Sequence, residues 1–483
     1  MRTIEQNPSL VDATREDASR KSQPTQEAQI DWRRTLVFGT LAAGLLSWVA
    51  FYNGYPTVTQ DSGGYLQTGA FHIALSPFRA PGYSVFTRWT SLRTSAWFTI
   101  ATQAILVVYI LHETFTHLIG GDKKYVDRCL LAGVCVLAAL SSLPWLVSEI
   151  MPDVFAGVLF LSAFLLAFAG ELRLGQRIVL ALIMVISVAA HASLFPIAVL
   201  YVTAIFVLRL VGRRTDGFPP IWSVLAWLLV PILAAGFWTA NTNQKMGLGF
   251  RLSPSKNAFL LGRLFGDGLA EDFLRENCPK RPFISCRYLS NLPKNEEDFL
   301  FSHQLYRDLK GHDDEMETIV HGTILAYPLR FVTSSARQTL LQLAALRTGG
   351  NMRLFVVTDW NFYDIMRVLP DDARAFWISR QSSDLLFPLT DAVVPIHTTI
   401  FWLSVAACLL LAWTGRFARI NKFLVSAIVF LVINAAVCGA FAGVYDRYQS
   451  RVAWIMPLCL IAYLCCLTRD WKRAVTRQDP SHP

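Results

Sequence analysis

The residues after the first apolar stretch of the chain have the makeup of a proton-transfer or phosphate-binding site. Asp61 is followed by a Ser-Gly-Gly run and then by Tyr65, and Arg79 precedes an Ala-Pro-Gly-Tyr stretch. A carboxylate held on a Gly-rich turn can act as a general base that accepts a proton from an attacking hydroxyl or amine. The structural alternative is an Asx turn, in which Asp61 only shapes the loop.

Two short turns further along the chain also carry ionisable side chains. The first, SEIMPD, contains Glu149 and Asp153, and the second, AAHASLFP, contains His191. Carboxylates close to a bilayer edge are uncommon unless they have a role. Asp153 could instead cap the helix that it opens. His191 could be a hydrogen-bonded structural residue or a substrate contact.

The last turn, GVYDRYQSRVAWIMPL, contains two arginines. Arg447 and Arg451 are four residues apart and share a face if the following helix begins early. Two guanidinium groups could hold a phosphate or pyrophosphate through paired hydrogen bonds. Snorkelling toward lipid headgroups is the alternative. The other short turns, near 148–153 and 191–194, contain no Lys or Arg, which favours the phosphate interpretation.

The elements that position these turns are long apolar segments. The chain has 483 residues, of which 53% are hydrophobic and 16% charged, against about 25% charged in an average soluble domain. The runs reach the roughly 20 residues that cross a bilayer core, and the short alternating stretches of a barrel are absent from the sequence. We expect ten spans, at about 35–52, 97–118, 129–147, 154–170, 178–190, 195–211, 221–240, 393–413, 423–443 and 452–468.

The distribution of basic residues predicts the orientation of these spans. Arg33 and Arg34 directly precede the first span, and the loops that would lie on the same side are rich in Arg and Lys. The positive-inside rule therefore places both termini in the cytoplasm and the turns described above on the outer side. The apolar run 178–211 enters and leaves on the same side, so we divide it at His191 to Pro196. The predicted location is the inner (plasma) membrane.

The expected fold is an all-α integral membrane protein with about ten transmembrane helices and a large, mainly helical insertion on the outer side. Helical stretches are expected within that insertion at about 296–310, 315–347 and 360–380. The predicted domains are a disordered cytoplasmic tail (1–34), an N-terminal transmembrane module (35–240) with its first outer loop (53–96), an extracytoplasmic region (241–392), C-terminal transmembrane helices (393–468) and a cytoplasmic tail (469–483).

Cysteine spacing and net charge bear on three features: a disulfide, a zinc site and a nucleic-acid partner. Cys278 and Cys286 lie in CPKRPFISC within the outer region, where an oxidising compartment would allow a small disulfide loop. Two unpaired thiols are the alternative. No pair of CxxC motifs suggests a zinc site. The net charge of +9 is spread over loops between spans and forms no single stripe, so we expect no nucleic-acid partner.

The order of these motifs resembles the GT-C superfamily of membrane glycosyltransferases, which includes protein O-mannosyltransferases and bacterial glycosyltransferases of lipopolysaccharide. The resemblance covers about residues 35–468. It is carried by DSGGYL and RAPGYSVF in the first outer loop, MPDVFAGVLF, HASLFPI, RYQSRVAWIMP, and the stretch AYPLRFV (326–332). One departure is Ser62, which stands where many members have a second acidic residue.

The resemblance implies that a sugar moves from a polyprenyl-phosphate donor to a glycan, lipid or protein acceptor on the outer side. Asp61 would be the general base, and arginines such as Arg447 or Arg451 would stabilise the leaving lipid phosphate. No nucleotide or other cofactor is implied, and Ser62 leaves a divalent metal as an open question. The implied substrate-binding residues are Tyr65, Arg79, Glu149, Asp153, His191, Arg447 and Arg451, and membrane lipids surround the spans.

Three alternatives fit parts of the sequence. A transporter or flippase of lipid-linked glycans would place ionisable residues near the midplane of its spans, whereas these spans are almost uncharged. A membrane acyltransferase could use His191 as its base. A catalytically inactive GT-C-like scaffold would keep the fold without the reaction.

Overall fold

The computed structural model describes residues 32–69, 77–211, 220–355 and 360–478. These segments are helical and contain no strand; two isolated β-bridges join Thr57 to Glu149 and Thr59 to Met352. Most of the predicted N-terminal tail and the last five residues of the predicted C-terminal tail lie outside the described residues.

Five stretches in the described part are long and apolar enough to cross a membrane. They are α6 (Ala96–Ile119), α12 (Ile221–Lys245), α20 (Phe387–Trp413), α21 (Ala418–Phe441), and the stretch Asp446–Lys472, which spans α22 (Asp446–Ala453) and most of α23 (Ile455–Gln478). Four shorter apolar stretches, Leu36–Leu46, Val154–Phe168, Leu174–Ala190 and Leu194–Leu210, accompany them. The helices are consistent with an integral membrane protein, and the count of ten spans stays a prediction.

Several helix boundaries differ from those expected. The run 178–211 does divide, into α10 (Leu174–Ala190) and α11 (Leu194–Val211). The expected first span instead forms α2 (Trp32–Leu46) and α3 (Trp48–Asn53). The expected span 129–147 forms α7 (Lys123–Leu140) and α8 (Leu143–Ser148), because Ser141 is extended and Pro144 begins a new helix.

Helix α9 (Val154–Phe168) lies at the centre of the bundle. Nearly all of its side chains are buried, so protein surrounds it on every face. Its 15 residues extend only about 22 Å, less than the ~30 Å of a bilayer core. At Gly157 a Cβ atom would lie 2.3 Å from Cζ2 of Trp454. Glycine therefore lets α9 approach the junction of α22 and α23.

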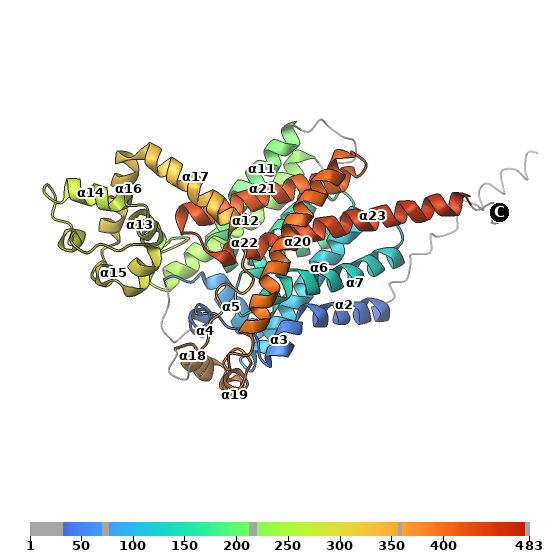
Figure 1. The fold of residues 1–483 in the computed structure, drawn as a ribbon, viewed down its shortest axis with the longest axis horizontal. Coiled ribbons are helices and arrows are strands. Elements are labelled where there is room, and N and C mark those ends of the chain that lie inside the picture. Colours follow the sequence, from blue (N-terminus) through green and yellow to red (C-terminus); the bar gives the residue numbers. More distant parts are fainter. Residues whose placement is uncertain (1–31, 70–76, 212–219, 356–359, 479–483) are drawn as a thin grey trace, which may run out of the picture.

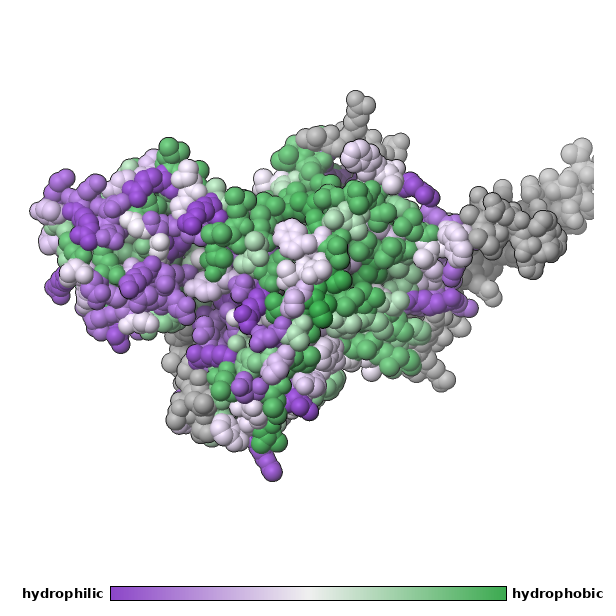
Figure 2. Space-filling model, in the orientation of Figure 1, coloured by the Kyte–Doolittle hydropathy of each residue, from purple (hydrophilic) through white to green (hydrophobic). Residues whose placement is uncertain are grey.

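A polar lobe stands at one end of the bundle, away from the C-terminal end of α23 (Figure 1). It has a hydrophobic core of its own, separate from that of the bundle. Figure 2 shows hydrophilic surface over this lobe and hydrophobic surface over the bundle. Its helices are α13 (Lys256–Gly266), α14 (Leu269–Asn277), α15 (Gln304–Asp308) and α16 (Asp313–Ala326).

The first two helices of the lobe were not expected, and the expected helix 296–310 is only a π turn, Asp298–Ser302, followed by the short α15. Ala258, Leu261 and Phe265 recur at helical spacing and are buried in the lobe core. That pattern is present in the sequence and is typical of a helix with one buried face.

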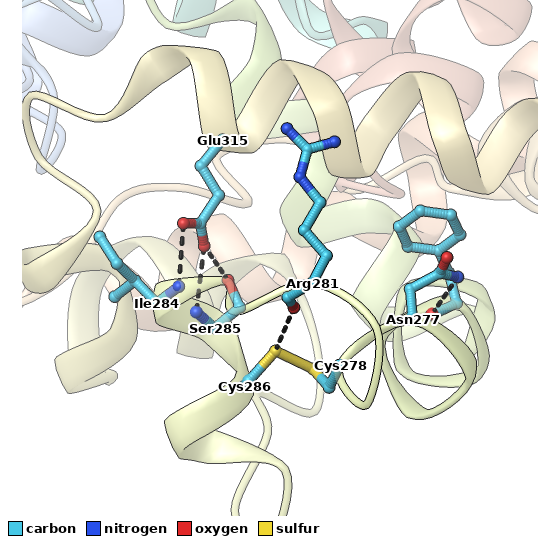
Figure 3. The surroundings of a disulfide bond; sticks show 8 residues. Asn277, Cys278, Arg281, Ile284, Ser285, Cys286 and Glu315 are labelled. Carbon is cyan, nitrogen blue, oxygen red and sulfur yellow. Dashed lines mark hydrogen bonds between the residues drawn. A yellow bond between two sulfur atoms is a disulfide. The ribbon is translucent and has the colours of Figure 1, made fainter.

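A disulfide between Cys278 and Cys286 closes the segment after α14 (Figure 3). The Glu315 carboxylate at the start of α16 accepts hydrogen bonds from the backbone N–H groups of Ile284 and Ser285, at 2.9 and 3.0 Å. The disulfide and this carboxylate together fix the loop against the rest of the lobe.

The chain returns from the lobe along α17 (Pro328–Ala344), which packs lengthwise against α21. It then forms α18 (Trp360–Val368) and α19 (Ala373–Trp377). Helix α18 lies beside α4 (Ser62–Gly69), which packs against α5 (Pro81–Thr90). Leu346, Phe355 and Phe376 join the main core of the bundle. This part of the predicted extracytoplasmic region therefore packs on the end of the bundle and encloses the first loop.

Candidate functional site

The segment before Asp61 is held in an extended conformation between two other parts of the chain. The N–H of Thr57 donates to the carbonyl of Ser148 at 2.9 Å, and the N–H of Ile150 donates to the carbonyl of Thr57 at 3.0 Å. On the opposite side the Gln381 amide bonds both backbone groups of Val58, at 3.0 and 2.6 Å. These bonds fix the position of the loop that carries Asp61.

The buried Asp61 carboxylate bridges two arginines. Its Oδ1 accepts from Arg79, and its Oδ2 accepts from Nη1 of Arg447 at 2.6 Å. Burial would raise the pKa of Asp61, but the charges of Arg447 and Arg79 outweigh it and hold the pKa below its usual value. No backbone N–H in the described segments donates to this carboxylate. Asp61 is thus an ion-pair residue here and makes no Asx turn.

Arg79 reaches Asp61 through a space left by a glycine. A Cβ atom on Gly64 would lie 3.3 Å from Cγ and Nε of Arg79. The guanidinium lies 5.7 Å from the ring centre of Tyr65, which packs edge-on against Tyr83. Tyr65 therefore supports Arg79, and the Gly-Gly pair leaves room for it.

Arg447, on α22, contacts three side chains. Besides Asp61, Nη2 donates to the Tyr448 hydroxyl at 3.2 Å. With the Asn351 amide turned so that its oxygen faces Arg447, that oxygen lies 3.2 Å from Nε and 3.0 Å from Nη1. The guanidinium is consequently fixed in orientation, with several N–H groups shared among neutral and charged acceptors.

Arg451 has a different environment from Arg447. It is fully buried and pairs with Asp153 at 3.3 Å. Its Nη2 also donates to Ser193 at 3.0 Å and to Asn434 at 2.8 Å. Asp153 begins α9 but makes no capping hydrogen bond. Arg451 thus joins three helices in the interior, and its buried side chain does not snorkel toward lipid headgroups.

His191 ends α10 and bonds within its own turn. Its Nδ1 accepts from the N–H of Ser193 at 3.2 Å and lies 2.8 Å from the Ser193 hydroxyl. Burial, followed by the charges of Arg451 and Arg447, lowers the pKa of His191 well below its usual value. The imidazole is therefore neutral, and the hydrogen bond from Ser193 to Nδ1 favours a proton on Nε2.

Glu149 faces a pocket that the first loop, α8, α22 and the segment after α17 enclose. The pocket is open to solvent, and the empty space in and in front of it is about 410 Å³. Burial, reinforced by the charge of Asp153, raises the pKa of Glu149 to about 8. The lining residues include Thr59, Ser142, Glu149, Asp153, Arg347, Gly350, Asn351 and Arg447.

No protein-family model, no curated protein and no solved structure matches this chain. The functional interpretation therefore depends on the chemistry of the site itself. The site consists of the Arg447 guanidinium and the Glu149 carboxylate, which both line the open pocket, and of the apolar helices next to the pocket. A site of this kind can hold an anionic group and transfer a proton.

The structure brings together most of the residues that the sequence suggested. Contacts connect the first loop with the last turn through Asp61 and Arg447, and connect the last turn with the middle turns through Arg451. Cys278 and Cys286 lie apart, in the lobe. Within the described segments, no group of three His, Cys, Asp or Glu residues could hold a metal ion.

Two parts of the site were not expected. The first is the turn from Thr348 to Asn351, whose Gly-Gly pair and flanking arginines give a recognisable pattern, TGGNMR. The second is Glu296, a buried lobe residue whose carboxylate lies against Gly443. Burial raises the pKa of Glu296 to about 8. The sequence around Glu296, KNEEDF, resembles an ordinary exposed turn.

Proposed function

We propose that this protein is a membrane glycosyltransferase that moves a hexosyl or pentosyl group from a polyprenyl-phosphate donor to a glycan, lipid or protein acceptor on the outer side of the membrane. The main support for this proposal is that four turns, distant in sequence, meet in one cluster of side chains. Asp61 contacts Arg447 across 386 positions, and Arg451 contacts Asp153 across 298. These are the turns whose motifs resemble the GT-C superfamily.

The position of the cluster supports a lipid-linked donor. A donor of this class has a phosphate between its sugar and its isoprenoid chain. Arg447 lines the open pocket, where it can stabilise the phosphate oxygen that gains charge as the bond to the sugar breaks. The apolar helices next to the pocket provide surroundings suited to the isoprenoid chain.

Asp61 orients Arg447 in this mechanism. Both of its oxygens accept hydrogen bonds from guanidinium groups, and its lowered pKa makes it a weak proton acceptor. Its carboxylate instead holds Arg79 and Arg447 at a fixed separation. This role differs from the general-base role that the sequence resemblance implies.

The polar lobe supports placement of the site on the outer side. A disulfide such as Cys278–Cys286 persists in oxidising compartments and is rare in the cytosol. The lobe and the pocket lie at the same end of the bundle, since Glu296 of the lobe lies against Gly443, close to Arg447. A donor would therefore enter from the outer leaflet.

The proposal can be tested with purified protein in lipid nanodiscs, a panel of undecaprenyl-phosphate hexoses and pentoses as donors, and a total cell-envelope extract as the source of acceptors. Release of undecaprenyl phosphate, measured by mass spectrometry, should depend on the protein. Envelope glycans from cells with and without the gene should then identify the sugar and the acceptor. Arg447→Ala is the control variant and should abolish release.

Two results would contradict the proposal. Movement of an intact lipid-linked glycan between leaflets, without cleavage, would indicate a transporter. Absence of both cleavage and movement, combined with an unchanged envelope composition, would indicate a scaffold.

A further inference from the structure

Glu149 and Asp153 line the pocket, and Asp61 pairs with Arg447, which also lines it. These three carboxylates differ in their cationic partners. Asp61 is paired with Arg79 and Arg447, and Asp153 is paired with Arg451. Among the described residues, no Lys, Arg or His lies within ion-pair distance of the Glu149 carboxylate, and no hydrogen bond reaches it. Glu149 is also partly exposed on the pocket wall. Its oxygens are consequently available to a bound molecule.

The backbone of Glu149 is held firmly although its side chain is free. Glu149 pairs with Thr57 in a β-bridge. Its carbonyl oxygen accepts from the Gln103 amide at 3.2 Å, and Gln103 itself accepts from the Tyr83 hydroxyl at 2.7 Å. The side chain therefore projects from a fixed point into the space beside Arg447.

We infer that Glu149 is the general base of the proposed transfer, whereas Asp61 is a positioning residue for the arginines. The inference depends on the proposed function. The acceptor oxygen attacks the anomeric carbon, and its proton passes to a Glu149 oxygen as the new glycosidic bond forms. The bond between that carbon and the phosphate oxygen breaks, and its electron pair leaves on the lipid phosphate beside Arg447. No other reactant is required.

The electrostatics of the pocket agree with this assignment. A base works best when its pKa is close to the working pH, and the pKa of Glu149 is about 8. A carboxylate already neutralised by two arginines has less affinity for a proton. The charged and titratable groups that face Glu149 from the surrounding elements are Asp61, Tyr83, Asp153, Arg347 and Arg447.

The test compares Glu149→Gln with Asp61→Asn in the nanodisc assay. Wild-type kcat/KM should rise with pH through an apparent pKa of about 8, because only the deprotonated carboxylate accepts a proton. Glu149→Gln should lower kcat on the order of 10² to 10⁴-fold and remove this pH dependence, with donor binding unchanged. Asp61→Asn should weaken donor use and keep the pH dependence.

A rescue experiment separates catalysis from a structural role. Formate added to Glu149→Ala should restore part of the rate, because the small carboxylate can occupy the space left by the side chain, and it should not restore Asp61→Ala. Glu149→Asp should keep partial activity and the pH dependence. If the wild-type protein transfers the sugar and Glu149→Gln is also active with the same pH dependence, the general-base inference is wrong and the proposed function stands. Absence of wild-type transfer from every donor would overturn the proposed function.

Discussion

Arg447 and Arg451 are four residues apart on α22, yet only Arg447 lines the pocket. Arg451 is 0% exposed, and its guanidinium contacts Asp153, Ser193 and Asn434. The same residue type therefore has two tasks within one helical turn. Substitution by lysine distinguishes them, because lysine retains the charge but lacks the planar set of donors.

Arg447→Lys should leave the protein folded and impair its use of the donor. Loss of one charged hydrogen bond, at about 1.5–3 kcal/mol, corresponds to a decrease in kcat/KM of roughly 10- to 100-fold. Donor-concentration curves on the purified variant would measure it. Arg275→Lys, at an exposed position of the lobe outside the pocket, is the matched control. Donor-concentration curves of Arg447→Lys that match those of the wild type would show that this residue does not bind the phosphate.

Arg451→Ala should destabilise the protein itself. Removal of one partner leaves Asp153 buried without its counter-charge, which typically costs about 3–5 kcal/mol. The fraction of monodisperse protein that survives heating in detergent should fall sharply, and Arg451→Lys should be intermediate. A variant as heat-resistant as wild type, but inactive, would instead indicate direct substrate contact.

Sequence reasoning identified the chemically important turns but could not assign partners within them. Residue type and spacing suggested the pair Arg447 and Arg451, and the resemblance to the GT-C superfamily implied that Asp61 acts with them. Which carboxylate pairs with which arginine depends on the packing of α9 against α22, and no local pattern encodes that packing. Asn351 and Glu296 were missed for the same reason, since their importance comes from what lies opposite them.

At the scale of elements, the Ala-Pro-Gly-Tyr stretch has a packing role. Pro81 begins α5, and a Cβ atom on Gly82 would lie 2.2 Å from the Ala189 carbonyl oxygen of α10. The close approach places the start of α5, just after Arg79, beside the end of α10, where His191 lies. The motif thus brings two parts of the site together, although its residues are not among those that line the pocket beside Glu149.

Gly82→Ala should force α5 and α10 apart. Overpacking of a tight contact typically costs about 1–3 kcal/mol, so thermal stability should fall and transfer activity with it. Gly175→Ala, on the same α10, is the matched control because a Cβ atom there meets nothing within 4 Å. Equal stability of the two variants would show that the helices adjust without strain.

The sequence predicted helix breaks correctly where polar residues interrupt a long apolar run. It did not predict breaks whose positions depend on tertiary contacts. The break between α10 and α11 was predicted because His191, Ser193 and Pro196 interrupt an otherwise apolar run. The break between α7 and α8 was missed, because Ser141 and Ser142 are small enough to pass for helix interior. Ser142 donates instead to the carbonyl of Ser450 at 2.7 Å, a contact that sequence does not reveal.

For the whole molecule, the principal prediction is the orientation of the chain. Alkaline phosphatase fused after residue 60, 270 or 390 should be active, because these positions should lie outside the cytoplasm. Fusions after residue 124, 214 or 418 should be inactive. Activity after residue 270 but not after residue 60 would place the lobe and the first loop on opposite sides of the membrane. Activity after residue 214 would contradict the predicted return of the run 178–211 to the cytoplasmic side.

The separation of 386 positions between Asp61 and Arg447 has a consequence for biosynthesis. A ribosome that has completed the first loop must still add most of the protein before α22 emerges. Throughout that interval Asp153 lacks Arg451, and Asp61 has Arg79 but not Arg447. Assembly of the site is therefore a late event of folding. A chain that stops before residue 446 would retain Asp153 without its counter-charge.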